Sequence, residues 1–194
     1  MEPRELINLS KALVRKLRHD IGKGHSLSCD EKGFVKVSEI ICKIRCTIDD
    51  IIHVVESNEK KRFTLEDRDG EYYIKANQGH SLSSGKAVCD SLSFTEITEP
   101  LPVCIHGTEA RFIDSILSNG LNRMKRKHIH CVGEIDKTRQ ISGFKQRSNK
   151  AIYIDMALCM VDGMRFYMSD NNVILTEGLN GVIERKYFRE IVDL

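Results

Sequence analysis

Three clusters of basic side chains are the residues of this 194-residue chain best suited to chemistry on a phosphate. They comprise Lys11, Arg15, Lys16 and Arg18; Lys60, Lys61 and Arg62; and Arg123, Lys125, Arg126 and Lys127. A guanidinium presents a planar fork of donors that matches two phosphate oxygens. Because all three clusters flank expected helices or strands, they predict a convergent anion site, although any one of them alone is more typical of a solvated charged face.

Two histidine arrangements lie beside these clusters. Arg18 and His19 adjoin near the expected end of the first helix, where a cation favours the helix dipole in any protein. His128 and His130 alternate on an expected strand, so both imidazoles share one face. This geometry suits a metal, but no third ligand stands at a recognisable spacing and four cations come before the pair. The pattern therefore favours a structural role or ligand binding, and we expect no metal.

The composition confines the chain to globular proteins of one domain or two small lobes. It is 41% hydrophobic and 30% charged, with a net charge of +2, which is too small to predict a nucleic-acid partner from bulk charge. No window approaches the ~20 apolar residues of a membrane span. The first thirty residues lack the apolar core of a secretory signal. We therefore expect a cytoplasmic protein, or a nucleocytoplasmic one in a eukaryote, that is not secreted.

The seven cysteines form no CxxC pair, and without a signal peptide they indicate reduced thiols. Cys42 and Cys46 are one helical turn apart, and both are expected to be buried. Familiar nucleotide motifs are also absent, including the phosphate-binding GxxxxGK[ST] loop and the GxGxxG turn. Any nucleotide must therefore bind by other means.

The N-terminal half has the element order of a winged helix. Leucines at positions 6, 9, 13 and 17 form one apolar stripe, which predicts a helix over residues 4–19. A strand over 33–37 precedes a helix over 39–44 that Ser38 can cap. Thr47 and Asp50 resemble a capping box for the next helix. Strands over 62–66 and 72–75 follow, joined by a turn that ends in Asp69-Gly70.

A second lobe is expected after a connector over residues 82–101 that is rich in serine, glycine and proline. It begins with a strand over 102–105, followed by a turn over 106–108 in which Thr108 can cap a helix over 109–118. Further strands are expected over 128–132, 151–154, 165–168 and 172–175. Short strands with few helices predict a mixed, largely antiparallel sheet.

The order of several short motifs resembles one family, the NAD-dependent RNA 2′-phosphotransferases known from tRNA splicing. Each motif is weak alone, but together they cover nearly the whole chain. The matching segments are Leu9-Ser10-Lys11-Ala12-Leu13, Leu17-Arg18-His19, Gly33-Phe34-Val35, Lys61-Arg62-Phe63, Ile74-Lys75-Ala76-Asn77-Gln78-Gly79-His80-Ser81, His106-Gly107-Thr108, Gly120-Leu121, Arg126-Lys127-His128-Ile129-His130, Tyr153-Ile154-Asp155, Gly163, Phe166 and Val173-Ile174-Leu175-Thr176.

The resemblance implies an α+β protein with two lobes. An N-terminal winged-helix lobe over residues 1–85 would bind RNA, and a linker would follow over 86–101. A C-terminal lobe of ADP-ribosyltransferase-like fold over 102–194 would bind NAD. No metal is implied, and a monomer is expected.

The resemblance also assigns roles to individual residues. The catalytic set falls on Arg18, His19, Arg62 and Arg126. The residues implied to bind NAD are His106, Gly107, Thr108, Gly120, His130 and Val173. The residues implied to contact RNA are Lys11, Lys61, Lys75, Gln78 and His80. His130 stands where many ADP-ribosyltransferases have Tyr, and Val173 stands where they have a catalytic Glu.

The family reaction has two steps. The 2′-phosphate of RNA attacks the ribose C1″ of NAD and expels nicotinamide. The 2″-hydroxyl of that ribose then attacks the phosphate, which releases repaired RNA and ADP-ribose 1″,2″-cyclic phosphate. Guanidinium groups would neutralise the phosphate dianion, and His19 would act as donor or general acid/base.

Three positions depart from the usual family pattern. Val14 replaces a frequent Ser, and Lys75 replaces a frequent Arg, which keeps the charge but loses the bidentate fork. Asn172 replaces a Gly, and asparagine tolerates a left-handed backbone.

Two other functions stay open: ADP-ribosyl capping of terminal phosphates on RNA or DNA, and a non-catalytic winged-helix binding protein.

Overall fold

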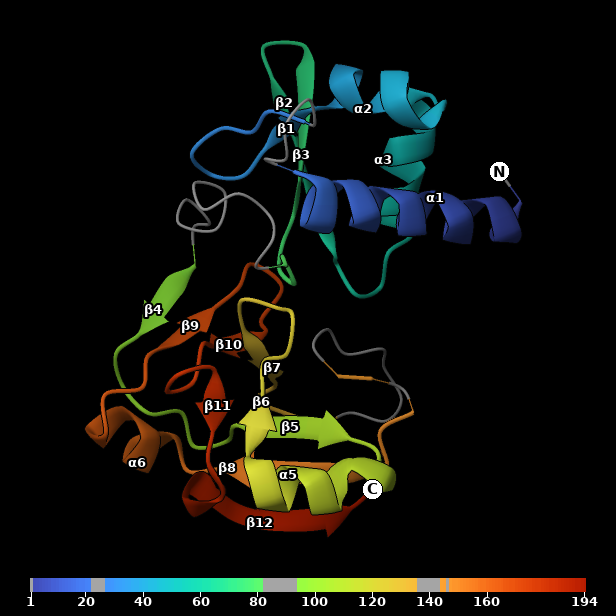
Figure 1. Cartoon of the computed structure of the whole chain (residues 1–194). Helices are drawn as coiled ribbons and strands as arrows, with labels where there is room; N and C mark the ends of the chain where they lie inside the picture. The colour runs from blue at the N-terminus through green and yellow to red at the C-terminus, as the bar shows by residue number, and fades with distance from the viewer. Residues whose placement is uncertain (1, 22–26, 82–93, 136–143, 146) are drawn as a thin grey trace. The chain divides into compact units, whose positions relative to one another are not determined.

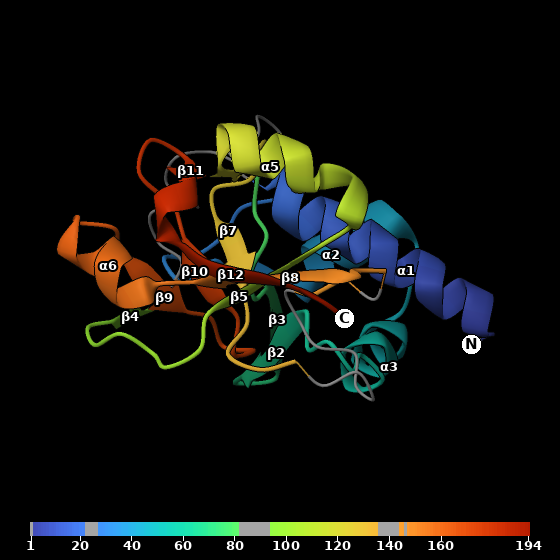
Figure 2. The ribbon, with the colours of Figure 1, turned by 90° about the horizontal axis from the view of Figure 1, so that it is seen from below.

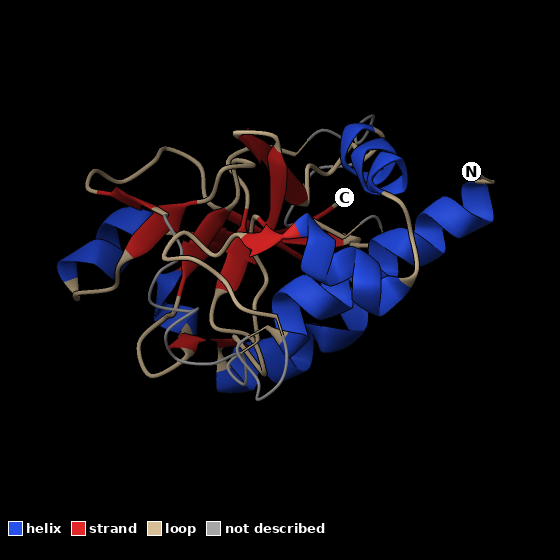
Figure 3. Cartoon of the chain, turned by 90° about the horizontal axis from the view of Figure 1, so that it is seen from above, coloured by secondary structure: helices blue, strands red, loops and turns tan. Residues whose placement is uncertain are grey.

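The computed structural model describes residues 2–21, 27–81, 94–135, 144–145 and 147–194 (Figure 1). The chain divides into two compact units, Met1–Ser93 and Phe94–Leu194, which we call unit 1 and unit 2. Helices and strands both occur along the chain (Figure 3), so the expected α+β class is confirmed. None of the described helices has the length and apolar character needed to span a membrane.

Unit 1 combines helices with a three-stranded antiparallel sheet in the order β1-β3-β2. Its elements are α1 (Pro3–Arg15), a π-helical turn (Lys16–Asp20), β1 (Val35–Lys36), α2 (Val37–Ile44), α3 (Ile48–Glu56), β2 (Phe63–Arg68) and β3 (Glu71–Ala76). Leu13 and Leu17 of the predicted stripe are fully buried, and Leu6 and Leu9 pack beside them. The first helix is therefore confirmed, although its last turn is π-helical.

Two local predictions in unit 1 are confirmed by hydrogen bonds and backbone angles. The Thr47 hydroxyl accepts from the Asp50 N–H at 3.2 Å, and the Asp50 carboxylate accepts from the Thr47 N–H at 2.9 Å. Asp69 and Gly70 both have positive φ, 54° and 84°, as the turn between β2 and β3 requires.

Two other predictions in unit 1 are wrong. Lys36, and not Ser38, is the N-cap of α2, because the helix begins directly after β1. Cys42 is exposed and Cys46 is only half-buried. Val37 and Ile40 form the fully buried face of α2, so the cysteine two residues after Ile40 lies on the solvent side.

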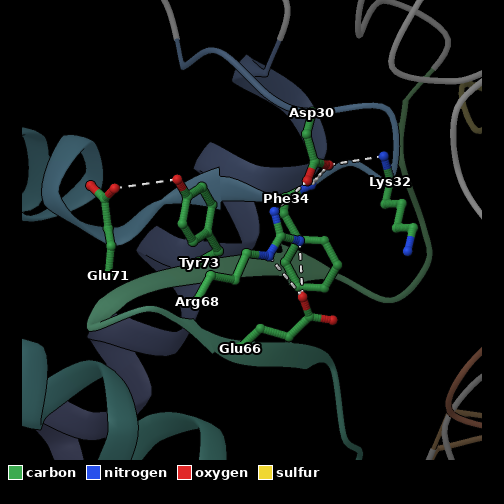
Figure 4. Close-up of polar contacts among 7 residues, drawn as sticks. All are labelled: Asp30, Lys32, Phe34, Glu66, Arg68, Glu71 and Tyr73. Carbon is green, nitrogen blue, oxygen red and sulfur yellow. Dashed lines mark hydrogen bonds and ion pairs between the residues drawn. The ribbon is translucent and has the colours of Figure 1, made fainter.

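An arginine in the hairpin fastens the sheet of unit 1 (Figure 4). The Arg68 guanidinium lies between the rings of Phe34 and Tyr73, with its central carbon 4.6 and 4.5 Å from the ring centroids. It also contacts the carboxylates of Asp30 at 2.7 Å and Glu66 at 2.9 Å. These contacts tie the hairpin to the loop before β1.

Unit 2 contains two larger antiparallel sheets, β4-β9-β10-β7 and β12-β8-β5, and a two-stranded pair, β11-β6. Figure 2 shows β8 between β5 and β12. The elements are β4 (Thr95–Ile97), β5 (Ile105–Thr108), a 3₁₀ turn (Ala110–Phe112), α5 (Ile113–Asn119), β6 (Leu121–Asn122), β7 (Ile129–Cys131), β8 (Lys150–Ile154), α6 (Met156–Val161), β9 (Phe166–Met168), β10 (Ile174–Thr176), β11 (Val182–Ile183), a second 3₁₀ turn (Arg185–Tyr187) and β12 (Phe188–Asp193). All the described strand pairs of unit 2 are antiparallel, so the expected predominance of antiparallel pairing is confirmed, and no described pair is parallel as a mixed sheet would require.

The start of unit 2 differs from the sequence prediction. Residues 106–108, expected as a turn, belong to β5, because Ile105–Thr108 pairs in register with Lys150–Tyr153 of β8. Thr108 therefore caps no helix: Glu109 is the N-cap of the 3₁₀ turn, and α5 starts only at Ile113.

Part of the expected linker over 86–101 is a strand. Residues 86–93 lie outside the described residues, whereas β4 pairs with β9 at the edge of a sheet. A strand of three residues at a sheet edge has too few alternating apolar and polar side chains to be recognised from its sequence.

Candidate functional site

Arg18 and His19 lie in the π-helical turn that ends the first helix. π-helical turns are rare in proteins, and those that occur often lie at functional sites. The Arg18 carbonyl accepts from the Ser81 N–H at 3.0 Å. A Cβ on Gly79 would lie 3.1 Å from Arg18 Nη1, so the missing side chain allows the guanidinium to rest on the backbone. The Arg18 side chain is thus held against the segment that follows β3.

Arg62 follows a tight turn whose last residue, Lys61, has a left-handed backbone with φ of 41°. The Asn58 side-chain oxygen accepts from both the backbone N–H of Arg62, at 3.2 Å, and its Nη1, at 3.3 Å. Burial lowers the pKa of Arg62, which still stays charged at neutral pH. Burial and then the Arg62 charge also lower the pKa of Lys60. This turn therefore concentrates positive charge.

The segment Asn77–Ser81 brings Arg18 and Arg62 into one neighbourhood. At its start, the Asn77 N–H donates to the Arg62 carbonyl at 2.9 Å, and at its end Ser81 bonds the Arg18 carbonyl. Two arginines that are 44 positions apart in the sequence thus have their backbones bonded to a single run of five residues, and the Arg18 guanidinium also lies against Gly79 within that run. Such a pair can neutralise a doubly charged phosphate ester.

The predicted RNA contacts in unit 1 differ in exposure. Lys11 on α1 and Lys61 in the turn are exposed. Lys75 is 7% exposed, and its Nζ lies 4.8 Å from the ring centroid of Phe34. The remaining two, Gln78 and His80, are also buried, at 6% and 3%.

The first basic cluster is partly neutralised within its own helix. The Asp20 carboxylate lies 3.1 Å from Lys16 Nζ and 3.8 Å from Arg15 Nε. These two cations therefore contribute less to an anion site than their number in the sequence indicates.

Arg126, the fourth predicted catalytic residue, lies in unit 2, in the turn after β6. The turn is held by Arg123, whose N–H donates to the Gly181 carbonyl at 3.0 Å and whose Nη1 donates to the Arg126 carbonyl at 3.2 Å. Met124 has a positive φ of 58°, and its N–H donates to the Asn122 side chain at 2.6 Å. The Arg126 side chain is exposed.

Among the predicted NAD contacts, the structure brings His106 and His130 together. His106 Nδ1 lies 2.8 Å from the His130 carbonyl oxygen, and since a carbonyl only accepts, Nδ1 carries the proton. Burial lowers the pKa of His106, against the opposing effect of that bond, so the ring is neutral at neutral pH. Its Nε2 is then an acceptor suited to a ribose hydroxyl.

The other predicted NAD contacts are more enclosed. A Cβ on Gly107 would overlap the Phe144 ring, and Thr108 is 7% exposed. Gly120 is the C-cap of α5, and a Cβ there would overlap the Val182 side chain. Val173 is fully buried, and its N–H donates to the Ser169 hydroxyl at 3.0 Å. The side chain of Val173 thus belongs to the core of unit 2.

His128, left open between structural and ligand-binding roles, is 6% exposed and packs edge-on against Phe94 and Tyr167. Burial, followed by the charges of Lys127 and Arg123, lowers its pKa to about 4. In the part of the chain that the structure describes, no three His, Cys, Asp or Glu side chains form a group able to hold a metal ion.

Sequence reasoning missed the two asparagines that surround Arg62. The Asn77 side-chain nitrogen donates to the Lys61 carbonyl at 2.8 Å, and Asn58 holds the arginine itself. Asparagine favours turns in general. That preference indicates a turn before β2, but not which side chain the amide will face.

Comparison with known proteins defines the class of this two-unit α+β protein. Residues 4–178 match the family described as RNA 2′-phosphotransferase, Tpt1 / KptA family. The match covers most of the chain, and the chain therefore belongs to this family of enzymes.

Individual relatives agree with the family assignment. A putative tRNA 2′-phosphotransferase of Schizosaccharomyces pombe is 40% identical over 191 residues, 96% of this chain. The tRNA 2′-phosphotransferase 1 of Danio rerio is 37% identical over 94% of the chain, and a probable RNA 2′-phosphotransferase of Flavobacterium johnsoniae is 34% identical over 88%. The alignments span 51%, 83% and 90% of these relatives, so the chain matches about half the length of the S. pombe protein.

Proposed function

We propose that this protein removes an internal 2′-phosphate from RNA, as at a spliced tRNA junction, and transfers it to NAD. The products are ADP-ribose 1″,2″-cyclic phosphate, nicotinamide and RNA with a free 2′-hydroxyl. Family membership over residues 4–178 supports the reaction class. The observation that carries the proposal is a pair of backbone hydrogen bonds. They join the carbonyls of Arg62 and Arg18 to opposite ends of the segment Asn77–Ser81.

In this proposal the two lobes divide the work. Residues 1–85 act as a winged-helix lobe for RNA, and residues 102–194, together with the strand β4 from the range 86–101 that was expected to be a linker, act as an ADP-ribosyltransferase-like lobe for NAD. The order of helices and hairpin in unit 1 and the antiparallel sheets of unit 2 support this division. The protein acts as a cytoplasmic monomer.

The chemistry of the phosphate sets the roles of the catalytic residues. Arg18 and Arg62 hold the oxygens of the 2′-phosphate dianion, so that one oxygen is presented to the ribose carbon of NAD. Arg126 stabilises the charge that develops in the transition state. His19 donates a proton to the departing 2′-oxygen in the second step, which yields the free 2′-hydroxyl.

NAD as second substrate fits the donor set of unit 2. The neutral His106 accepts a ribose hydroxyl through Nε2, because Nδ1 is committed to the His130 carbonyl. Gly107 and Thr108 provide strand backbone beside it. The surroundings of His106 are supported by Gly120 at the end of α5, by His130 on β7 and by Val173 in the core of unit 2.

RNA binding combines exposed and enclosed groups. Lys11 and Lys61 attract the backbone through charge, which makes RNA affinity fall steeply with salt. Lys75, Gln78 and His80 act close to the phosphate.

The test supplies the protein with NAD and a short RNA that carries one internal 2′-phosphate. We expect nicotinamide release, loss of the phosphate and formation of the cyclic product. An RNA of the same sequence with a 2′-hydroxyl is the control and should release none. A 5′-phosphorylated RNA examines the capping alternative: capping alone, without reaction of the 2′-phosphate, would overturn the proposal.

A further inference from the structure

We infer that Asn58 is a positioning residue of the phosphate site, which orients the Arg62 guanidinium while leaving its charge available to the substrate. This inference rests on the proposed function. Asn58 contacts the side chain of Arg62 and would not itself contact the reacting atoms.

The backbone places the Asn58 amide at the start of a closed turn. Its N–H donates to the Val55 carbonyl at 3.3 Å, and its own carbonyl accepts from the Lys61 N–H at 2.8 Å. Lys61 completes the turn in the left-handed region, which costs free energy for a residue with a side chain. The strained turn thus brings Arg62 back to the amide that began it.

The chemistry of the contact favours a neutral acceptor. One oxygen accepts from the Arg62 backbone and from Nη1, so the side chain is fixed relative to its own main chain. Among the described residues, no hydrogen bond reaches the edge formed by Nε and Nη2, which is the edge that pairs with two oxygens of a phosphate. A carboxylate at the Asn58 position would instead bind the guanidinium as an ion pair and compete with the phosphate.

The turn has a second support that does not depend on the Asn58 side chain. Asn77 donates its side-chain N–H to the Lys61 carbonyl at 2.8 Å and its backbone N–H to the Arg62 carbonyl at 2.9 Å. The Asn77 side-chain oxygen accepts from the Thr64 hydroxyl at 2.7 Å. Removal of the Asn58 amide should therefore loosen the guanidinium more than the fold.

Two substitutions separate positioning from a merely structural role. Asn58→Ala removes the acceptor, and Asn58→Asp keeps an acceptor of the same shape but adds a negative charge. We expect Asn58→Ala to lower kcat/KM for 2′-phosphorylated RNA roughly tenfold. We expect Asn58→Asp to lower it at least as much, mainly through a higher KM, with an unfolding temperature equal to or above that of the wild type.

The control lies one residue away. Ser57 is the C-cap of α3, and its hydroxyl donates to the His53 carbonyl at 2.6 Å without touching Arg62. Ser57→Ala should keep wild-type kcat/KM. Wild-type kcat/KM in Asn58→Asp would overturn the inference, because a structural acceptor is all that this variant preserves.

A binding measurement without NAD distinguishes failure of this inference from failure of the proposed function. The anisotropy of a labelled RNA gives the affinity with and without an internal 2′-phosphate. Asn58→Asp should reduce the preference for the phosphorylated RNA roughly tenfold. An unchanged preference overturns the role of Asn58, whereas a wild-type protein that prefers the phosphorylated RNA but releases no nicotinamide overturns only the proposed reaction.

Discussion

The turns that carry Arg62 in unit 1 and Arg126 in unit 2 are built alike but treat their arginines differently. Each contains an asparagine and a residue other than glycine with positive φ, Lys61 at 41° and Met124 at 58°. In the first turn the asparagine bonds the guanidinium of Arg62. In the second, the hydrogen bonds that reach Arg126 from described residues involve its backbone, through Arg123.

The difference concerns when each arginine is ordered. Arg62 is half-buried and its guanidinium is held by Asn58, whereas Arg126 exposes more of its surface to solvent, although burial lowers the pKa of both arginines. An ordered guanidinium loses little conformational entropy on binding, while an exposed one must lose it when the ligand binds. We infer that Arg62 contributes to ground-state binding of the phosphate and that Arg126 contributes mostly in the transition state.

Replacement of either arginine by alanine should have the largest effect. Arg62→Ala and Arg126→Ala should each reduce kcat/KM for 2′-phosphorylated RNA by roughly 10²- to 10³-fold, the usual loss for one group that stabilises developing charge. Arg62→Ala should raise KM as well, and Arg126→Ala should act on kcat with KM nearly unchanged. Steady-state nicotinamide release measures both constants. Identical effects on KM would break the comparison between the two turns.

The two units should also respond differently to acid. His128 in unit 2 takes up a proton near pH 6.5 when unfolded, but its folded pKa is about 4. Between these two pKa values the unfolded chain therefore binds more protons than the folded one. The contribution of His128 to the free energy of unfolding is complete above pH 6.5 and falls by about 3 kcal/mol as the pH drops to 4. In unit 1, the bonds from Arg68, Phe34 and Lys32 outweigh burial and lower the pKa of Asp30, whose contribution is lost only below its ordinary value of 3.8.

Hydrogen exchange at pH 7.5 and pH 4.5 measures this difference unit by unit. Unit 2 should lose more protection than unit 1 at the lower pH. His128→Phe, which keeps an aromatic ring beside Phe94, should flatten the pH dependence of unit 2. Equal loss of protection in both units would contradict the prediction.

A pair of glycine substitutions compares the packing of the two units. Gly120 in unit 2 has φ of 74°, and a Cβ there would overlap Val182 and lie 2.8 Å from the Ile183 carbonyl oxygen. Gly70 in unit 1 has φ of 84°, but a Cβ would meet nothing within 4 Å. Gly120→Ala should therefore cost roughly 2–3 kcal/mol of stability, against about 1 kcal/mol for Gly70→Ala, where only backbone strain remains. Urea unfolding tests this, and equal costs would mean that β11 moves aside without penalty.

The smallest expected effect is that of lysine substitutions. Arg62→Lys loses the hydrogen bond to Asn58 and the planar fork of donors, so it should lower kcat/KM roughly tenfold. Arg126→Lys keeps the charge on a side chain that is already exposed, so it should lower kcat/KM only about threefold. Nicotinamide release gives both values. A greater loss in Arg126→Lys would show that bidentate geometry matters more in unit 2.

Features that depend on near neighbours were predictable from sequence. The capping box of Thr47 and Asp50, the Asp69-Gly70 turn and the leucine stripe of α1 are confirmed. Asn172 also adopts a left-handed backbone, with φ of 58°, as its replacement of glycine suggested. In each case residues within one or two turns of chain set the conformation.

Features that depend on distant partners were not predictable. The π-helical turn around Arg18 has no sequence signal, and residues 106–108 became a strand because β8 offers a pairing edge. Short strands such as β6 and β11 have the same origin. Burial of Val173 follows from its place directly before β10 and not from its residue type alone.

By itself, the sequence determined the family, the positive charge near the predicted site and the local elements, because residue types and short spacings encode all three. Only the tertiary structure decided that Asn77–Ser81 meets both Arg18 and Arg62, that Asn58 faces a guanidinium, and that His106 is neutral with its proton on Nδ1. These contacts depend on the path of the backbone between residues far apart in sequence, and on burial, which no local pattern specifies.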